Sequence, residues 1–234
     1  IGVGVSAPGI LRAHGATMTD KPIGLMREYV TLLRECLSGE QVTFEGDYFS
    51  IKRFQLGVRL GNRKPKIIMA ALNPQMLKLA GELADGVLLN YIPASHVAGS
   101  VKLVREGGDA TIYAYVHAAV GRLEERIRSA QRDLFNYAMA DGYAKMFRQA
   151  GFADEVDLLR TRFAEKDREG AVGAISERMV QAIDFIGSES DVSHFVRSYI
   201  DAGIEYPVLM PMPWGDDRRY VTDATMRAAI AAIN

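Results

Sequence analysis

Asn73 and Pro74 stand where a short apolar run, residues 66–72, gives way to a helical pattern. Asparagine is a favoured N-cap and proline is favoured in the first turn of a helix, so ordinary capping explains the pair. A helix start also presents unpaired backbone N–H groups and the positive end of the helix dipole, which bind phosphate groups. The residues alone leave both interpretations open, capping and phosphate binding.

Polar residues also come at the ends of two other apolar runs. Ser6 follows the run at the start of the chain, in which Gly2 and Gly4 would let a neighbouring backbone or a flat ligand come close. The spacing G-x-G-x-x-x-x-G is not the dinucleotide-binding fingerprint, and no phosphate-loop lysine follows it. Asn90 stands at the end of the third run. We therefore regard Ser6 and Asn90 as candidates for contact with a ligand.

Histidine and tryptophan side chains add a few candidates. His14 and His96 stand on predicted loops and are the better candidates for polar contact with a substrate. His117 lies inside the strand-like run "YVHAAV", and we expect it to be a hydrogen-bonded residue of the interior. Trp214, on a proline-rich segment after the last apolar run, could wall an aromatic ligand or pack against the closing helix.

Several familiar catalytic motifs are absent from the sequence. It has no H-E-x-x-H segment and only one cysteine, so a metal site has no support. It has no G-x-S-x-G segment, which argues against a serine hydrolase. No catalytic residue can be named from the sequence. A reaction carried by a bound cofactor would fit this pattern, because the protein then supplies mainly binding and orientation.

Composition narrows the class of protein. The 234 residues have a formal net charge of −1, which argues against a nucleic-acid partner, and 48% of them are hydrophobic, as in an ordinary globular chain. No apolar run reaches the ~18 residues of a membrane helix, and no signal-peptide pattern opens the chain. We expect a cytoplasmic protein that acts on a small molecule, without a nucleic-acid or membrane partner, and leave a homodimer open.

Strand-like and helical patterns alternate along the chain. Nearly continuous apolar runs, typical of strands buried on both faces, occur at residues 1–5, 66–72, 86–92, 111–120 and 206–212. Alternation with helices predicts βαβ units and a parallel sheet, either doubly wound or a (β/α)₈ barrel. Because the chain opens directly on a strand-like run without a methionine, we expect the C-terminal part of a longer chain. A barrel of which five strands are present then fits better, with the site at the strand carboxyl ends.

Two segments exceed a minimal βαβ repeat. The segment "VTFEGDYFSIKRF", residues 42–54, predicts a hairpin, and residues 121–200 are long enough to hold extra helices. One of these helices is expected over 175–186, ended by Gly187, and the pattern Ser188-x-x-Asp191 predicts a capping box for the next. The last helix is expected over 222–234. No change of composition marks a boundary, so we expect 1–234 to belong to a single domain.

The segment "KPKIIMAALNPQMLKLAGELADGVLLNYIP" closely resembles a strand–helix–strand segment of the luciferase-like monooxygenase superfamily, above all of its branch that uses the deazaflavin coenzyme F420. The segments "IGVGVSAPGILRAHG", "KPIGLMREYVTLLRECLSGEQVTFEGDYFSI" and "DVSHFVRSYIDAGIEYPVLMP" resemble the fourth strand, the helix and hairpin after it, and the closing helix and eighth strand of that family. Together these segments cover most of the chain.

The resemblance implies a (β/α)₈ barrel of α/β class that lacks its first three strands, with the cofactor across the strand carboxyl ends. It implies that Ala71, Leu72 and Asn73 help to hold the cofactor phosphate and that Ser6 faces the ring system; with Asn90 they form the predicted cofactor site. The implied activity is F420-dependent hydride transfer to or from a small organic substrate. An FMN-dependent monooxygenase that uses O₂ and a non-catalytic cofactor-binding fragment remain the alternatives.

Overall fold

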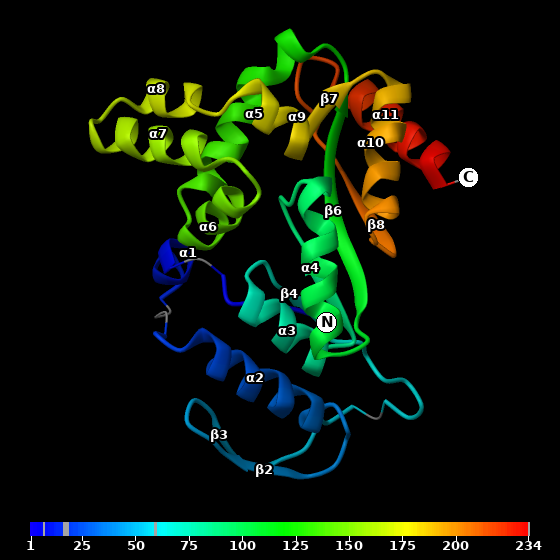
Figure 1. Ribbon diagram of the computed structural model, residues 1–234. Coiled ribbons are helices and arrows are strands. Elements are labelled where there is room, and N and C mark those ends of the chain that lie inside the picture. The colour runs from blue at the N-terminus through cyan, green and yellow to red at the C-terminus, as the bar shows by residue number, and fades with distance from the viewer. Residues whose placement is uncertain (7, 16–18, 59, 234) are drawn as a thin grey trace. The chain divides into compact units, whose positions relative to one another are not determined.

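The computed structural model (Figure 1) describes residues 1–6, 8–15, 19–58 and 60–233. Ala7, inside one of the quoted segments, and Asn234, the expected end of the last helix, lie outside the described residues. The chain forms two compact units: residues 1–88 with 102–111 make the first unit, and residues 89–101 with those from 112 onward make the second. None of the described helices is long and apolar enough to cross a membrane.

Three parallel strands run through the first unit in the order β1 (Gly2–Val3), β4 (Ile68–Ala70) and β5 (Gly86–Leu89). Helix α3 (Pro74–Leu83) connects β4 to β5 and completes a βαβ unit. The side chains of Met69 and Val87 are fully buried, as the continuous apolar runs predict. The predicted strands are therefore confirmed, although each is shorter than its apolar run.

A hairpin and two helices precede β4 in the first unit. The helices are α1 (Pro8–Ala13) and α2 (Pro22–Cys36), and the antiparallel hairpin consists of β2 (Val42–Glu45) and β3 (Ser50–Phe54). The carboxylate of Glu28, on α2, accepts hydrogen bonds from the backbone N–H groups of Asp47 and Tyr48, each at 2.9 Å, and of Phe49 at 2.6 Å. A Cβ atom on Gly46 would lie 2.4 Å from that carboxyl carbon, so a larger residue there would displace the Glu28 carboxylate from the turn.

Helix α3 and the C-terminal part of α4 (Ala94–Gly107) pack backbone against backbone in the first unit (Figure 1). A Cβ atom on Gly81 would lie 2.1 Å from the carbonyl oxygen of Val104, and one on Gly107 would lie 2.1 Å from that of Lys78. No side chain fits between two backbones at this distance. Gly81, the first glycine of the "AGELADG" segment, is therefore explained by helix packing.

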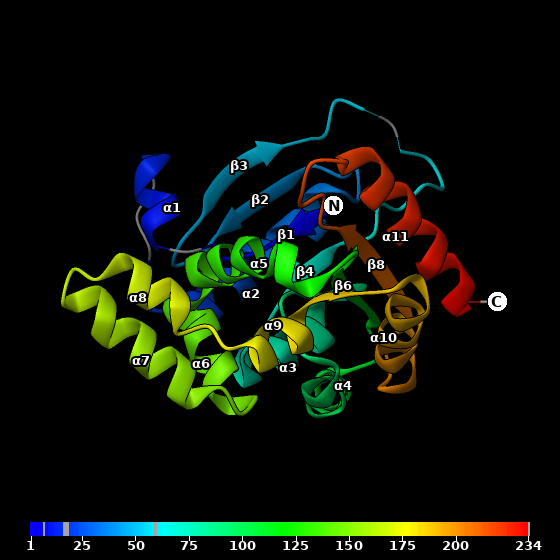
Figure 2. The same cartoon turned by 90° about the horizontal axis from the view of Figure 1, so that it is seen from above.

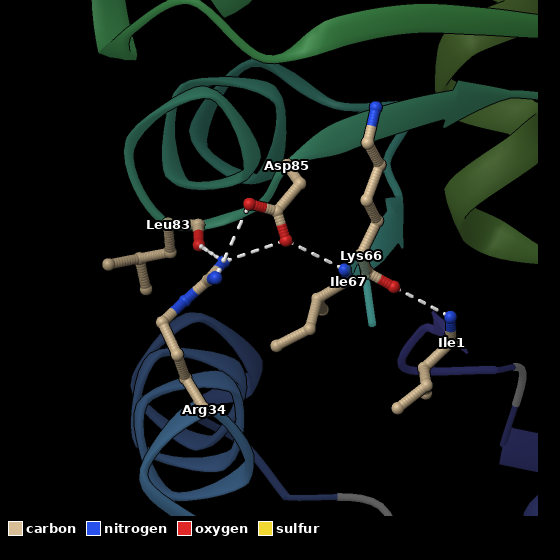
Figure 3. A network of polar contacts seen from close by, with 6 residues as sticks. All are labelled: Ile1, Arg34, Lys66, Ile67, Leu83 and Asp85. Atoms are coloured by element: carbon tan, nitrogen blue, oxygen red, sulfur yellow. Dashed lines mark hydrogen bonds and ion pairs between the residues drawn. The ribbon is translucent and has the colours of Figure 1, made fainter. Parts of the chain in front are cut away.

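Asp85 ties together the amino-terminal ends of β4 and β5 (Figure 3). Its carboxylate accepts the N–H of Ile67 at 2.8 Å, and its own N–H donates to the carbonyl oxygen of Ile67 at 2.9 Å. Arg34, on α2, donates to both carboxylate oxygens and to the carbonyl oxygen of Leu83. Burial would raise the pKa of Asp85, but these hydrogen bonds and the nearby cations lower it. Because ligand sites lie at the other end of parallel strands, this network is structural.

The second unit is built on the long strand β6 (Thr111–Val120). It pairs in parallel with β8 (Tyr206–Pro211) along residues 113–118 and with β7 (Asp184–Gly187) along residues 117–120. Its further helices are α5 (Leu123–Ala138), α6 (Asp141–Gln149), α7 (Ala153–Ala164), α8 (Arg168–Gly173), α9 (Glu177–Ile183), α10 (Glu189–Asp201) and α11 (Arg218–Ile233).

Helices α10 and α11 lie side by side in the second unit (Figure 2) and cover one face of β6. Ala118, on β6, is fully buried against Val192, on α10, and Ala224, on α11. The hydroxyl of Thr225, on α11, accepts the N–H of Val120 at 2.9 Å, so the last rung of the strand is bonded to the helix. The residues of β6 with odd numbers, His117 among them, belong to the opposite face.

Strand β7 corrects the prediction of one continuous helix over residues 175–186. The structure ends α9 at Ile183 and begins β7 at Asp184, because pairing with β6 is preferred over another helical turn. The apolar spacing of Ile183 and Ile186 fits a helix, which is why the pattern is misleading here. The predicted capping box is confirmed: Ser188 accepts the N–H of Asp191, and the carboxylate of Asp191 accepts the N–H of Ser188.

Candidate functional site

The carboxyl ends of β1 and β4 lie beside each other, because the two strands are parallel neighbours. A Cβ atom on Gly4, just after β1, would lie 3.2 Å from the Cβ of Ala70, so close packing accounts for this glycine, whereas nothing lies within 4 Å of Gly2. Ser6 follows with a φ of 65°, a left-handed conformation that residues other than glycine rarely adopt. Strained residues of this kind cluster at ligand sites.

The predicted phosphate-binding residues follow β4 directly. Ala71 is buried, and its N–H donates to the carbonyl oxygen of Leu88 at 3.3 Å, while Leu72 is half-buried. Asn73 occupies the N-cap of α3, with φ −104° and ψ 154°, and its carbonyl oxygen accepts the N–H of Leu77 at 2.9 Å. Asn73 is thus the N-cap, as predicted, but its side chain makes no cap hydrogen bond. Pro74 fixes φ at the first position of the helix and does not need that hydrogen bond.

The first turn of α3 carries no acidic side chain. The positive end of its dipole is therefore not neutralised locally, and its N–H groups face the carboxyl end of β4. The first unit thus brings four of the five predicted residues, Ser6 and residues 71–73, to the same end of two adjacent strands. This arrangement can hold an anionic group such as a phosphate.

Asn90, the fifth predicted residue, belongs to the second unit, where its Nδ2 atom donates to the hydroxyl oxygen of Tyr143 at 3.0 Å. Its Oδ1 atom is buried and has no hydrogen-bond partner among the described residues. Burial raises the pKa of Tyr143 to about 12, although the bond with Asn90 acts the other way, so that hydroxyl stays protonated at neutral pH. A donor group on a ligand would satisfy the buried amide oxygen.

Tyr91 follows with a φ of 51°, a second strained residue directly after a strand. Its ring centroid lies 4.0 Å from that of His117 and 3.7 Å from that of Tyr137. Its hydroxyl donates to the Oδ2 atom of Asp133, on α5, at 2.7 Å. Burial, followed by the hydrogen bond with Tyr137 and the charge of Asp133, raises the pKa of Tyr91. The phenol therefore stays protonated and acts as a donor.

Asp184 lies in the pairing register of His117 and is completely buried. Burial raises its pKa well above the ordinary value, and Asp133 raises it further. Burial also raises the pKa of Asp133, against the lowering effect of its hydrogen bonds with Tyr91 and Asp184. The Nδ1 atom of His117 lies 3.7 Å from Oδ1 of Asp184, too far for a hydrogen bond, and burial lowers the pKa of His117 to about 4. At neutral pH a neutral imidazole therefore lies beside a fully buried carboxyl group whose charged form is disfavoured by burial.

The structure corrects two histidine predictions and places the other aromatic candidates. His117 is interior, as expected, but its Nδ1 atom has no hydrogen-bond partner among the described residues, because the unpredicted strand β7 places Asp184 beyond bonding distance. The loop position predicted for His96 is wrong, because His96 lies in the first turn of α4, where burial lowers its pKa. His14 follows α1. Trp214 lies between β8 and α11, and its backbone N–H donates to the carbonyl oxygen of Met212 at 2.7 Å.

Sequence reasoning missed Asp133, Asp184 and Tyr143, because they meet only through the fold. One signal could have found the two carboxylates: Asp184 is flanked by large apolar residues in the segment "AIDFI", and Asp133 is followed by two of them in "RDLF", where a solvated acid is less expected. Among the residues that the structure describes, no group of three or more histidine, cysteine, aspartate or glutamate side chains could hold a metal ion.

Comparison with known proteins gives three informative matches. The family model described as luciferase-like monooxygenase matches residues 1–206. A 5,10-methylenetetrahydromethanopterin reductase of Archaeoglobus fulgidus is 26% identical over 94% of this chain and 69% of its own. An F420-dependent glucose-6-phosphate dehydrogenase of Nakamurella multipartita is 25% identical over 88% of this chain and 62% of its own.

A solved structure extends the comparison. The coenzyme F420-dependent tetrahydromethanopterin reductase of Methanopyrus kandleri matches 100% of this chain and 73% of its own, with a TM-score of 0.78 and 20% sequence identity. This likeness confirms the predicted fold class, an α/β barrel with parallel strands. The chain spans about two thirds of the length of the curated relatives that it matches.

Proposed function

The chain belongs to the luciferase-like monooxygenase family, whose model matches most of its length, and we propose that within this family it is an F420-dependent oxidoreductase. It would transfer a hydride to or from a small organic substrate. The observation that carries the proposal is the match over most of the chain to a methylenetetrahydromethanopterin reductase and to an F420-dependent dehydrogenase. Both are enzymes that act on small molecules, and the second is named for F420.

The first unit offers residues that fit the anionic part of such a cofactor. We propose that the N–H groups at the start of α3, with Ala71, Leu72 and Asn73, hold the phosphate. The absence of an acidic side chain from the first turn of α3 supports this role. Ser6, strained at the end of the neighbouring strand, would contact the ring system.

Asn90, in the second unit, is proposed as a further cofactor contact. Its buried Oδ1 atom has no hydrogen-bond partner among the described residues and could accept a hydrogen bond from an N–H group of the ring system. Its Nδ2 atom is fixed by Tyr143, so the acceptor oxygen is held in a defined direction. An acceptor fixed in this way is suited to orientation of the ring.

F420, when bound, supplies the hydride-accepting and hydride-donating ring carbon. The residues named above bind and orient, and none of them is required to form a covalent intermediate. The imidazole of His117 and the phenols of Tyr91 and Tyr143 carry no charge at neutral pH. The substrate would be a small organic molecule that can lose or accept a hydride.

Binding of each cofactor to the protein tests the proposal. Fluorescence and absorbance titrations with F420 and with FMN should show tight binding of F420. Tight binding of FMN without affinity for F420 would instead support a monooxygenase that uses O₂, as the family description allows. Failure to bind either cofactor would support a non-catalytic protein.

The substitution Asn73→Asp tests the phosphate contact. Aspartate is as good an N-cap residue as asparagine, but its negative charge should repel a phosphate, so affinity for F420 should fall. The matched control is Asn73→Ser, which is also a good N-cap residue but is neutral, and should retain the affinity. If the two variants bind F420 equally tightly and are equally stable, the start of α3 does not hold a phosphate.

A further inference from the structure

We propose that Asp133 and Asp184 share one proton inside the second unit, and that this carboxyl pair, through Tyr91, holds Asn90 in place at the end of β5. Asp133 and Asp184 are thus positioning residues. Only the importance of Asn90 rests on the proposed function. The proton-sharing pair and its effect on Tyr91 and Asn90 follow from the geometry of the second unit by itself.

Asp184 must keep a proton to be stable where it lies. It is fully buried at the first position of β7, and neither of its oxygens accepts a hydrogen bond from a donor among the described residues. An ionised Asp184 would therefore be a buried charge without compensation. As a carboxylic acid it donates its O–H to the facing carboxylate of Asp133 and needs no other donor.

Asp133 is the acceptor at the centre of the arrangement. It accepts the hydroxyl of Tyr91 at 2.7 Å on its Oδ2 atom and faces Asp184. Two carboxyl groups in contact in a buried place resist the loss of their last shared proton, as in paired-carboxylate enzymes. With one proton the pair carries a single negative charge, and the hydroxyl of Tyr91 donates a hydrogen bond to it.

The groups that face the pair from the surrounding elements do not supply a positive charge. His117, on β6, is neutral because burial lowers its pKa to about 4. Tyr91, after β5, and Tyr199, on α10, are protonated phenols whose pKa values are raised first by burial. Within the described part of the chain, no lysine or arginine forms an ion pair with either carboxylate. The shared proton therefore neutralises one of the two negative charges that the carboxyl groups would otherwise carry.

The pair is coupled to Asn90 through Tyr91. Tyr91 holds a strained φ of 51° while its hydroxyl reaches Asp133 and its ring packs between His117 and Tyr137. This conformation is maintained by those side-chain contacts, because the backbone alone does not favour it. Asn90 is the preceding residue, so the direction of its side chain depends on the turn that Tyr91 makes.

The proton can be observed without any cofactor. In protein labelled with ¹³C at the aspartate carboxyl carbons, NMR at neutral pH should show a protonated or proton-sharing carboxyl. That signal should disappear in Asp184→Asn, which keeps the shape of the side chain. In Asp133→Asn it should remain as the signal of a fully protonated Asp184, because burial alone disfavours the charged form of that carboxyl. It should remain in Asp201→Asn, a control at the exposed end of α10. If all aspartates of the wild-type protein are ionised at neutral pH, the proposal is wrong, and this result needs no variant to fold.

The positioning effect has its own readout. The chain contains five asparagines, so selective ¹⁵N labelling gives few side-chain amide signals, and Asn90→Gln identifies that of Asn90. This signal should shift in Asp133→Asn, Asp184→Asn and Tyr91→Phe, and stay unchanged in Asp201→Asn. An Asn90 signal that none of the three variants moves would overturn the positioning role.

Cofactor binding separates this proposal from the proposed function. If wild-type protein binds F420, Asp184→Asn should weaken the binding about tenfold, the worth of about one hydrogen bond. If wild-type protein binds neither F420 nor FMN while the two NMR results hold, the proposed function is wrong and the carboxyl pair stands. Unchanged F420 affinity in Asp184→Asn, despite a shifted Asn90 signal, would contradict the role of the pair in the site.

Discussion

Tyr91 and His117 stack ring on ring inside the second unit, with centroids 4.0 Å apart and planes inclined by 29°. The stack shields the imidazole from water, and His117 is only 3% exposed. This burial accounts for a pKa of about 4 in the folded protein, well below the ordinary histidine value. At a pH between these two values, His117 therefore stays neutral in the folded protein and is protonated in the unfolded chain.

Stability should fall as the pH is lowered through the range in which His117 titrates. The folded pKa is depressed, so the contribution is fully present above the unfolded value of about 6.5 and is lost as the pH falls toward 4. The shift corresponds to about 3 kcal/mol over this range. Urea unfolding of wild type and His117→Gln, at a series of pH values, should show a difference in unfolding free energy that shrinks with decreasing pH.

The control for this prediction is His194→Gln, at an exposed position of α10. It changes the same residue type without touching the stack and should keep the pH dependence of wild type. If the unfolding free energy of His117→Gln depends on pH between 4 and 6.5 in the same way as that of wild type, another group causes the acid sensitivity.

Loss of the Tyr91 hydroxyl should destabilise the protein by about 1–3 kcal/mol, because the Oδ2 atom of Asp133 would then lose its hydroxyl donor in a largely buried place. Tyr91→Phe keeps the ring and its stacking and removes only the O–H group. Chemical denaturation of this variant should be compared with Tyr220→Phe, whose ring is 53% exposed on α11 and should have little effect. Equal, small effects of both substitutions would contradict the importance of the hydrogen bond.

The sequence alone predicts local features such as strands and helix starts. It does not predict the tertiary contacts between residues of the candidate site. Apolar runs such as that of Met69 predict buried strands because periodicity is a local property, and Asn73 was correctly placed at the start of α3. The strand that begins at Asp184 was missed because a four-residue strand inside a helical pattern is decided by its pairing with β6. The pairing of Asp133 with Asp184 was beyond reach for the same reason, since it exists only after α5 and β7 pack together.

Gly81→Ala should strongly destabilise the first unit. The added methyl group would lie 2.1 Å from the backbone oxygen of Val104, and backbone cannot move aside as a flexible side chain can. Overpacking typically costs about 1–3 kcal/mol, and this contact belongs at the upper end of that range. Denaturant unfolding measures the loss.

The matched control for Gly81→Ala is Gly99→Ala, in the exposed middle of α4, where nothing lies within 4 Å of an added Cβ atom. This second substitution should stabilise the protein by up to about 1 kcal/mol, since alanine favours a helix over glycine. If Gly81→Ala were as harmless as Gly99→Ala, the two helices would not pack at the distance seen here.

Replacing Asp85 should separate its hydrogen-bonding role from its charge. Asp85→Ala leaves the buried N–H of Ile67 without its acceptor and should cost about 1–3 kcal/mol. Asp85→Asn keeps an acceptor oxygen and loses only the ionic part of the contact with Arg34, a half-exposed pair that contributes about 0–1 kcal/mol. Urea unfolding should therefore rank the two variants clearly, with Asp109→Ala, fully exposed, as the neutral control. If Asp85→Asn were as damaging as Asp85→Ala, the charge pair with Arg34 would be the dominant contact, and the joint between β4 and β5 would depend on salt concentration.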